Sequence, residues 1–280
     1  MSYCSVGDLR RFLQFTPIRV TDEKIGVGDG VTKEFHTLFK PIVDPDYDGV
    51  VIDDVEVKVG GLPVQVSSVD CDEGCISLLE SPPPGLDVTA SYSWHPVSDH
   101  ELKVAIDAAE GEIDSECGRS FKESLHEERV YLSHGNTISL LNTPVIRIES
   151  IIVESHNGEV LEELKPSMYE CYPELGVIRL KKYCAGVVLP PWYVPTAFYV
   201  RVRYLSGYFE VPGIVKQAAL LLSSYHVLSR ISMLYTTEPE YQGRISMVFK
   251  KPGEIFSRLE FLRKEVERIK KNLPRQVKVL

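Results

Sequence analysis

The sequence predicts an α+β protein in which helical segments alternate with two β-rich stretches. Apolar residues recur at helical spacing near the N-terminus, around residue 105 and over the last third of the chain. Between these segments, residues 26–94 and 128–205 contain short apolar runs separated by Gly, Pro and Asp, as half-buried strands do. We therefore expect a helical bundle with a β-rich segment, plus a small inserted all-β domain of the sandwich type.

The composition is that of an ordinary globular protein. The chain has 280 residues, of which 44% are hydrophobic and 25% charged, and these values exclude a disordered chain, a fibre and a long coiled coil. Since no run of about 18 apolar residues occurs, we expect no membrane span. The N-terminus lacks an apolar stretch behind a basic start, so we expect no signal peptide and synthesis in the cytoplasm.

The first 96 residues predict a short helix followed by a β-module. Ser5 is placed to cap a helix over residues 5–15, whose apolar stripe comprises Val6, Leu9, Phe12 and Leu13. The composition changes near Ile25, and we assign residues 25–96 to the inserted module. Residues 67–80 read as strand, turn and strand, and residues 86–94 as a strand with Leu86, Val88, Ala90, Tyr92 and Trp94 on one face.

The second helix is expected to begin at Ser98, because Ser98 and Glu101 have the spacing of a capping box. Gly118 is placed to end it. The apolar face comprises Leu102, Ala105, Ile106, Ala109, Ile113 and Cys117. The opposite face is acidic and includes Asp107, Glu110 and Asp114.

Residues 128–205 predict strands again. We expect one hairpin turning at Gly135-Asn136 and another turning at Asn157-Gly158, a strong two-residue turn signal. Two further strands follow, separated by an exposed loop that contains Pro190, Pro191 and Pro195.

The last third is expected to be helical. Residues 211–235 start with Pro212 and are apolar nearly all round, which is typical of a central buried helix. Residues 254–273 carry a heptad seam, and a basic tail follows Pro274. The seam comprises Ile255, Leu259, Leu262, Val266, Ile269 and Leu273. These segments divide the chain into residues 1–24, 25–96, 97–235 and 236–280.

Charge is unevenly distributed along the chain. The net charge is −9, yet residues 25–96 hold 3 basic and 13 acidic side chains, whereas residues 212–280 hold 13 basic and 6 acidic ones. Such asymmetry indicates separate partner surfaces. The polar side of the last helix has two interpretations: a solvated face with ion pairs such as Glu260–Lys264 and Glu267–Lys271, or a surface that docks onto an acidic partner. Direct binding of nucleic acid is disfavoured because aromatic residues are not interleaved with the basic ones.

We expect no catalytic, cofactor or metal site. The Gly-rich stretch at residues 26–30 lacks the spacing of a phosphate loop, and the seven histidines occur singly. No CxxC motif is present, and free thiols are favoured over a bridge between Cys71 and Cys75. The stretch from Asp44 to Gly49 resembles half of a calcium loop but lacks its distal Glu.

Several short motifs resemble the head–tail connector (adaptor) family of tailed phages. They are a helix with Ile-Asp at 106–107 and 113–114 that ends in Gly-Arg-Ser-Phe (118–121), a Thr-Pro-Val strand (143–145), and Gly-Tyr (207–208) ahead of a Val-Pro (211–212) that starts a buried helix. The resemblance covers residues 1–24 and 97–235. Residues 26–94 look like a β-module that recurs in phage structural proteins, where this family normally has a short loop.

The resemblance implies a helical bundle of the connector type, in a ring of typically twelve copies at the neck of a virion. Such a ring binds the portal protein, extends the channel through which double-stranded DNA passes on ejection, and presents a platform to a stopper or tail completion protein. Because C-terminal segments in this family tend to embrace the portal, we expect portal docking through Ile255, Leu259, Leu262, Arg263, Val266, Arg268, Ile269, Lys270, Lys271 and Arg275. The acidic Asp107, Glu110 and Asp114 would suit a channel wall, since like charge keeps DNA from sticking.

The favoured function is therefore a non-enzymatic, structural head–tail adaptor made in the host cytoplasm and assembled into the virion. One alternative is a virion-associated binding module for carbohydrate or decoration, in which Trp192 and Tyr193 would matter most. Another is a different neck or tail completion protein. A hydrolytic enzyme is disfavoured because no paired acid and base motif is evident.

Overall fold

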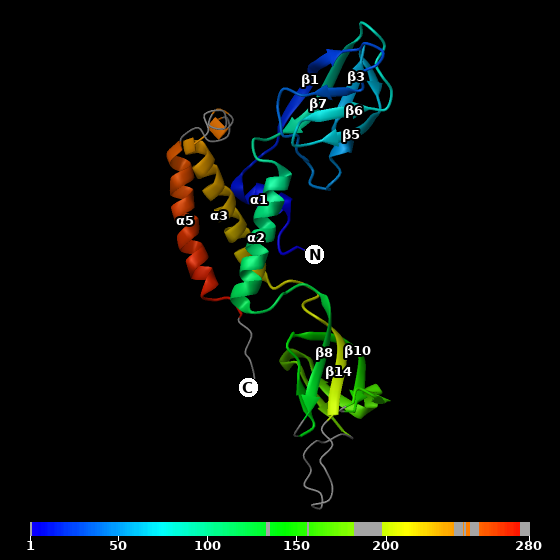
Figure 1. Cartoon of the computed structure of the whole chain (residues 1–280). Coiled ribbons are helices and arrows are strands. Elements are labelled where there is room, and N and C mark those ends of the chain that lie inside the picture. Colours follow the sequence, from blue (N-terminus) through cyan, green and yellow to red (C-terminus); the bar gives the residue numbers. More distant parts are fainter. Residues whose placement is uncertain are drawn as a thin grey trace, which may run out of the picture. The chain divides into compact units, whose positions relative to one another are not determined.

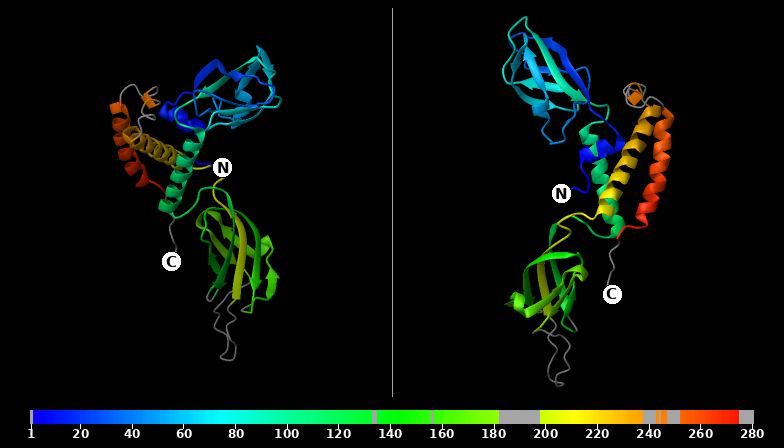
Figure 2. Two further views of the ribbon diagram at one scale, coloured as in Figure 1. Left: turned by 45° about the horizontal axis from the view of Figure 1, so that its top comes forward. Right: turned by 180° about the vertical axis from the view of Figure 1, so that it is seen from behind.

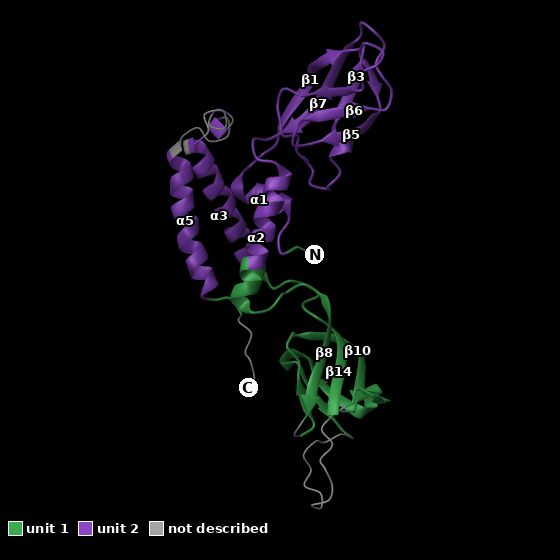
Figure 3. Ribbon diagram, viewed as in Figure 1, with its two compact units in different colours: residues 1–2, 112–215, 272–280 green, residues 3–111, 216–271 purple. Residues whose placement is uncertain are grey.

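Figure 1 presents a computed structural model of the chain, which describes residues 2–132, 135–155, 157–181, 198–237, 243, 245–246 and 252–274. The chain forms two compact units (Figure 3). Unit 1 comprises residues 1–2, 112–215 and 272–280, and unit 2 comprises residues 3–111 and 216–271. Helices and antiparallel sheets occur together, so the predicted α+β class is confirmed.

The long helices begin and end close to the predicted residues. They are α1 (Val6–Leu13), α2 (Asp99–Cys117), α3 (Gly213–Thr237) and α5 (Pro252–Lys270). In unit 2, α3 and α5 lie side by side in all the views of Figures 1 and 2. Helix α3 is the central one: Val215, Ala218 and Leu228 are fully buried. None of the described helices combines the length and the apolar character that crossing a membrane requires.

The predicted caps are present. In α1 the Ser5 hydroxyl accepts the Asp8 N–H at 3.0 Å, and the Asp8 carboxylate accepts the Ser5 N–H at 3.2 Å, which completes a capping box. In α2 the Ser98 hydroxyl accepts the Glu101 N–H at 3.0 Å. Gly118 follows α2 with a φ of 68°, the left-handed conformation in which glycine ends helices.

The β-module of unit 2 has two sheets that share one core. Strand order is β1-β7-β3-β4 in one sheet and β2-β6-β5 in the other. Side chains from both sheets, among them Phe35, Val57, Ile76 and Tyr92, form its buried cluster. The strands are β1 (Ile18–Val27), β2 (Glu34–His36), β3 (Glu56–Val59), β4 (Leu62–Val64), β5 (Val66–Asp70), β6 (Cys75–Leu78) and β7 (Asp87–Trp94), with the 3-10 turn η1 at Val51–Asp54.

Two details of the module differ from the sequence prediction. Strand β1 begins at Ile18, ahead of residue 25, because it pairs with β7 from Ile18↔Trp94 onward. Strand β7 begins only at Asp87, and Leu86 is 41% exposed rather than part of the buried face. Ser91 and Ser93 are buried as well, so both faces of this strand are covered near its end. The predicted strand–turn–strand at residues 67–80 is confirmed as β5 and β6.

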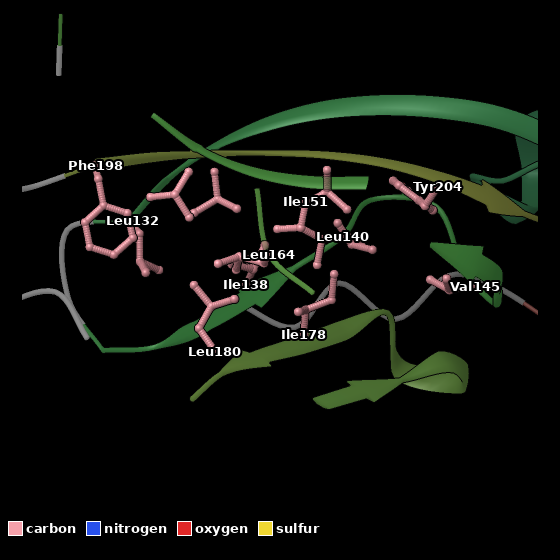
Figure 4. Packing of buried hydrophobic residues seen from close by; sticks show 13 residues of the cluster. Leu132, Ile138, Leu140, Val145, Ile151, Leu164, Ile178, Leu180, Phe198 and Tyr204 are labelled. Atoms are coloured by element: carbon pink, nitrogen blue, oxygen red, sulfur yellow. The ribbon is translucent and has the colours of Figure 1, made fainter. Parts of the chain in front are cut away.

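The β-domain of unit 1 also packs two sheets around one core (Figure 4). Strand order is β11-β10-β14-β8 in one sheet and β12-β13-β9 in the other. Ile138, Ile151, Ile178, Val200 and Tyr204 are among its buried side chains. The strands are β8 (Ser124–Leu132), β9 (Thr137–Ser139), β10 (Val145–Glu154), β11 (Val160–Glu163), β12 (Tyr169–Tyr172), β13 (Val177–Leu180) and β14 (Phe198–Ser206), and two 3-10 turns are η2 (Pro166–Met168) and η3 (Pro173–Leu175).

One of the two predicted hairpins of this domain is confirmed and one is wrong. Strands β10 and β11 pair across Asn157-Gly158, as the turn signal predicted. Strand β8 instead pairs with β14, and β9 with β13, so the segments on either side of Gly135-Asn136 lie in different sheets. The long strand β14 pairs with every residue of β8 and so offers backbone hydrogen-bond partners along its whole length, which the short strand β9 could not do. The predicted exposed loop around Pro190 lies outside the described residues.

A buried ion pair ties the β-module to the helices of unit 2. The Arg10 side chain is fully buried, and its Nε donates to Asp99 at 2.8 Å while its Nη2 donates to the Val97 carbonyl at 2.9 Å. The other oxygen of Asp99 accepts the Asp44 N–H at 2.9 Å. Arg10 and Asp99 together therefore join α1, the start of α2 and a loop of the module.

We expect Arg10→Ala to lower the free energy of unfolding by about 3 kcal/mol, because it leaves a partly buried carboxylate without its cation and opens a cavity. Arg11→Ala is the matched control: that side chain is 67% exposed, and its loss should cost less than about 0.5 kcal/mol. Urea unfolding followed by circular dichroism measures both. Equal losses in the two variants would contradict the role assigned to Arg10.

His95 lies beside this ion pair and is buried as a neutral ring. Its Nδ1 accepts the Val97 N–H at 3.0 Å, and its ring stacks on Phe15 with centroids 4.9 Å apart. Burial, and secondly the charge of Arg10, lower the pKa of His95 from 6.5 to about 3. The unfolded chain therefore binds a proton on this ring at a pH where the folded chain does not.

Because the folded pKa is depressed, the stability due to neutral His95 is complete above pH 6.5 and is lost as the pH falls from there toward about 3. We expect His95→Asn, which keeps an acceptor for Val97, to reduce the slope of stability against pH in this window by at most about 1.4 kcal/mol per pH unit. Melting temperatures at pH 7.5, 6 and 5 measure it. His36→Asn, at an exposed position, should keep the wild-type slope, and an unchanged slope in His95→Asn would refute the assignment.

Candidate interaction surfaces

Three of the motifs that carry the phage resemblance meet at one end of the β-domain in unit 1. The Tyr208 N–H donates to the Phe121 carbonyl at 3.3 Å, and their rings stack with centroids 5.6 Å apart. The Gly207 N–H donates to the Pro144 carbonyl at 3.0 Å. Gly-Arg-Ser-Phe, Thr-Pro-Val and Gly-Tyr therefore form one structural junction, although they lie far apart in sequence.

Arg119 extends this junction to the C-terminal segment. Its guanidinium lies 5.0 Å from the ring centroid of Phe121 and 5.8 Å from that of Tyr208, within the range of cation–π attraction. Its Nη2 also donates to the Pro274 carbonyl at 3.4 Å. The sequence analysis included Arg119 only as part of the Gly-Arg-Ser-Phe motif and predicted no contact for it. What it missed is that the side chain links the segment before the β-domain to Pro274, shortly after α5.

The acidic face predicted for α2 is only partly exposed. Asp107 is exposed and Asp114 is half-buried. Glu110 is 4% exposed, and its carboxylate accepts the Tyr3 N–H. This corrects the prediction for Glu110, whose carboxylate is used inside unit 2 and does not belong to an exposed wall. A channel-lining role for Asp107 and Asp114 stays a prediction.

The heptad seam of α5 is already covered in the isolated chain. Ile255, Leu262, Val266, Ile269 and Leu273 are buried, and Leu259 is half-buried. Four of these buried residues, Ile255, Leu262, Val266 and Ile269, were predicted to contact the portal, and their burial removes them from the exposed surface of the helix.

The charged side of α5 remains available. Side chains of Arg263, Lys264 and Arg268 are 70–73% exposed, and Lys271 is exposed as well. The expected pair between Glu260 and Lys264 is present at 3.1 Å. Glu267 instead lies 3.6 Å from Arg263, and Glu265 lies 2.7 Å from Arg268. Such exposed pairs contribute little to stability, so they leave these cations able to meet a partner. Arg275 and the basic tail lie outside the described residues.

The calcium-like stretch folds as a tight loop whose carboxylates bind its own backbone. Oxygens of Asp44, Asp46 and Asp48 all lie within 4.8 Å of one another. Asp44 accepts the N–H groups of Tyr47 at 2.6 Å and Gly49 at 2.7 Å, and Asp48 accepts that of Val50 at 2.7 Å. These are side-chain to backbone bonds typical of Asp in turns, and they account for the spacing of the three residues.

A charged cluster on the outer face of the β-domain was not found from the sequence. Glu154 on β10 is 2% exposed and accepts hydrogen bonds from Arg129 on β8, at 2.8 Å, and from Arg201 on β14. Arg129 also lies 4.0 Å from the ring centroid of Tyr199. The alternation of arginines along β14 was a local signal, but the cluster needs the pairing of three strands distant in sequence.

Among the described cysteines, Cys4, Cys71, Cys75 and Cys171 have thiol pKa values raised by burial, so none of these four is an activated thiol. Cys4, Cys71, Cys75, Cys117 and Cys171 form no disulfide. Burial raises the pKa of both Cys4 and Cys71 to about 11, which disfavours the nucleophilic thiolate. Trp192 and Tyr193, on which the carbohydrate-binding alternative rested, lie outside the described residues.

No family model matches the chain, and no curated protein matches it either. Similar solved chains come from gene transfer agent (GTA) particles. A chain from the neck of an empty particle, computed with C6 symmetry, has a TM-score of 0.34 and 18% identity over 46% of this chain and 66% of that chain. A chain from the neck of a native particle, computed with C12 symmetry, has a TM-score of 0.32 and 19% identity, and the match covers 45% of this chain and 69% of that chain. A chain from the virion of a native particle has a TM-score of 0.34 and 17% identity, and the match covers 65% of this chain and 80% of that chain.

Gly207 allows the three motifs to approach one another. Its φ is +118°, and a Cβ added there would lie 2.3 Å from the Lys122 carbonyl oxygen. We expect Gly207→Ala to lower the free energy of unfolding by about 3 kcal/mol, since both backbone strain and a backbone clash oppose it. Gly158→Ala is the control: its φ is +85° with no atom within 4 Å of the added Cβ, so only strain of about 1 kcal/mol applies. Thermal unfolding compares them, and equal costs would contradict the close approach.

Proposed function

We propose that this protein is a non-enzymatic structural component of a tailed-virus neck, a head–tail adaptor that works as a homo-oligomeric ring. The observation that carries the proposal is the junction of Arg119, Phe121, Pro144, Gly207 and Tyr208. Short motifs resemble a family by chance in many sequences. Three motifs that also meet in space share one structural task, and this supports a common origin with the adaptors.

The helical elements support the same proposal. The resemblance covers residues 1–24 and 97–235, which supply α1, α2, the β-domain and α3. The β-module that interrupts this region has its own buried cluster and its own two sheets. A domain with its own core can be inserted at a surface loop at little cost to the rest of a fold. The module is thus compatible with an adaptor, although its task is separate.

Partners are assigned from charged side chains on α5, on α2 and in the C-terminal tail; of these, Arg263 and Asp107 are exposed, and Lys270 and Asp114 are half-buried. We assign portal docking to the flank of α5 that carries Arg263 and Lys270, together with the tail containing Arg275. A stopper or tail completion protein would bind elsewhere on the ring. Asp107 and Asp114 are candidates for the wall of the DNA channel, because acidic side chains repel phosphates.

Two measurements test this proposal. Native mass determination of the purified chain, with and without the portal of the same virus, should give a ring of about a dozen subunits. A map of the intact virion should place the chain at the neck. A map whose neck lacks the chain would refute the proposal, and so would turnover of a substrate as the main activity of the purified protein.

A further inference from the structure

Helix α5 carries a second stripe, distinct from its buried seam. Phe261, Lys264 and Arg268 of α5 and Lys271, the residue directly after it, follow one another at spacings of three and four residues, which places them along one face. All four are exposed, and Phe261 is 61% exposed. We call these four residues the basic stripe. A large exposed aromatic side chain among cations is typical of a protein-binding surface.

The β-module carries a surface of opposite character, which we call the acidic patch: Asp46, Asp48, Asp53 and Asp54, with Asp44 beneath them. Asp46, Asp48 and Asp53 are exposed. Burial, and then the charges of Asp46 and Asp44, raise the pKa of Asp54, although Arg19 opposes the shift. Cys71 lies within reach of the charge of Asp44 and of three more carboxylates, those of Asp72, Asp99 and Asp70. Carboxylates here repel one another, and added cations would relieve that repulsion.

We propose that the basic stripe of one copy docks on the acidic patch of a second copy. The argument is charge complementarity within a single sequence: residues 25–96 hold 3 basic and 13 acidic side chains, and residues 212–280 hold 13 and 6. Val50, next to Asp48 and 44% exposed, offers an apolar contact for Phe261. This inference rests on the proposed function only for the closure of the ring.

The geometry of such a contact fits a ring. Stripe and patch are different surfaces of one chain, so the contact is head-to-tail, and each copy uses both surfaces. Head-to-tail contacts close into rings when the rotation between copies allows it. Portal docking remains possible beside it, because Arg263 and Lys270 are offset from the stripe around the helix.

Charge reversal on each surface tests the contact. The stripe variant is K264E/R268E/K271E, and the patch variant is D46K/D48K, which keeps Asp44 and its hydrogen bonds to the Tyr47 and Gly49 N–H groups. Wild-type protein should self-associate at low salt and dissociate as salt rises from about 0.05 to about 0.5 M, because exposed charges are screened. Each variant alone should associate at least tenfold more weakly, as read by sedimentation velocity or mass photometry.

Mixing the two variants is the decisive step. In an equimolar mixture the negative stripe of one variant faces the positive patch of the other, and the remaining stripe and patch are likewise opposite in sign. Association should therefore recover in the mixture although each component alone is monomeric. A control with the same charge change on other exposed residues, K103E/K165E/R179E, should associate as the wild type does. Circular dichroism verifies that each variant is folded.

Three results would overturn the inference: a monomeric wild-type protein at low salt, association unaffected by either reversal, or a mixture that stays monomeric. Loss of portal binding in the stripe variant with unchanged self-association would assign the stripe to the portal instead. Failure of the proposed function is distinguishable, since it is decided by the presence of the chain at the neck of the virion.

Discussion

The β-module and the β-domain share one constraint: the first strand of each, by which the chain enters, pairs with the last strand, by which the chain leaves. In the β-module β1 pairs with β7 from Ile18↔Trp94, and in the β-domain β8 pairs with β14 from Ser124↔Ser206. The chain thus returns to the place from which it departed, and a helix can continue there. At each return a small cluster holds the ends together, around Arg10 and Asp99 in unit 2 and around Phe121 and Tyr208 in unit 1.

The sequence predicted what depends on neighbours along the chain. Ser5 and Ser98 cap helices because the spacing to Asp8 and Glu101 is a local signal, and Asn157-Gly158 turns a hairpin for the same reason. The heptad spacing of α5 likewise identified the residues that are buried. Local patterns do not say which segment becomes a partner. The hairpin at Gly135-Asn136 failed because β8 had a longer partner in β14, far away in sequence.

The sequence also did not predict which charged residues are buried. Glu110 lies on the side of α2 that reads as acidic, yet Tyr3 donates to its carboxylate and the residue is buried. Arg10 sits in a helix that reads as amphipathic, and nothing in its spacing marks it as the one cation enclosed with Asp99. A buried charge needs a partner from another element, and sequence periodicity describes one element at a time. Candidate sites built from charge were therefore the least secure part of the sequence reasoning.

In the assembly proposed above, the two stripes of helix α5 have separate tasks: the seam stabilises the monomer, and the basic stripe contacts a second copy. The apolar seam of Leu262, Val266 and Ile269 is buried inside unit 2, so the seam itself needs no partner. The basic stripe stays hydrated, and its exposed ion pairs are individually weak. Weak contacts suffice in a closed ring, because each copy is held through two interfaces and cannot leave by breaking one. A charged contact is also selective for its partner, because surfaces of like charge repel one another. Apolar seams in the same role would have driven unassembled copies to aggregate.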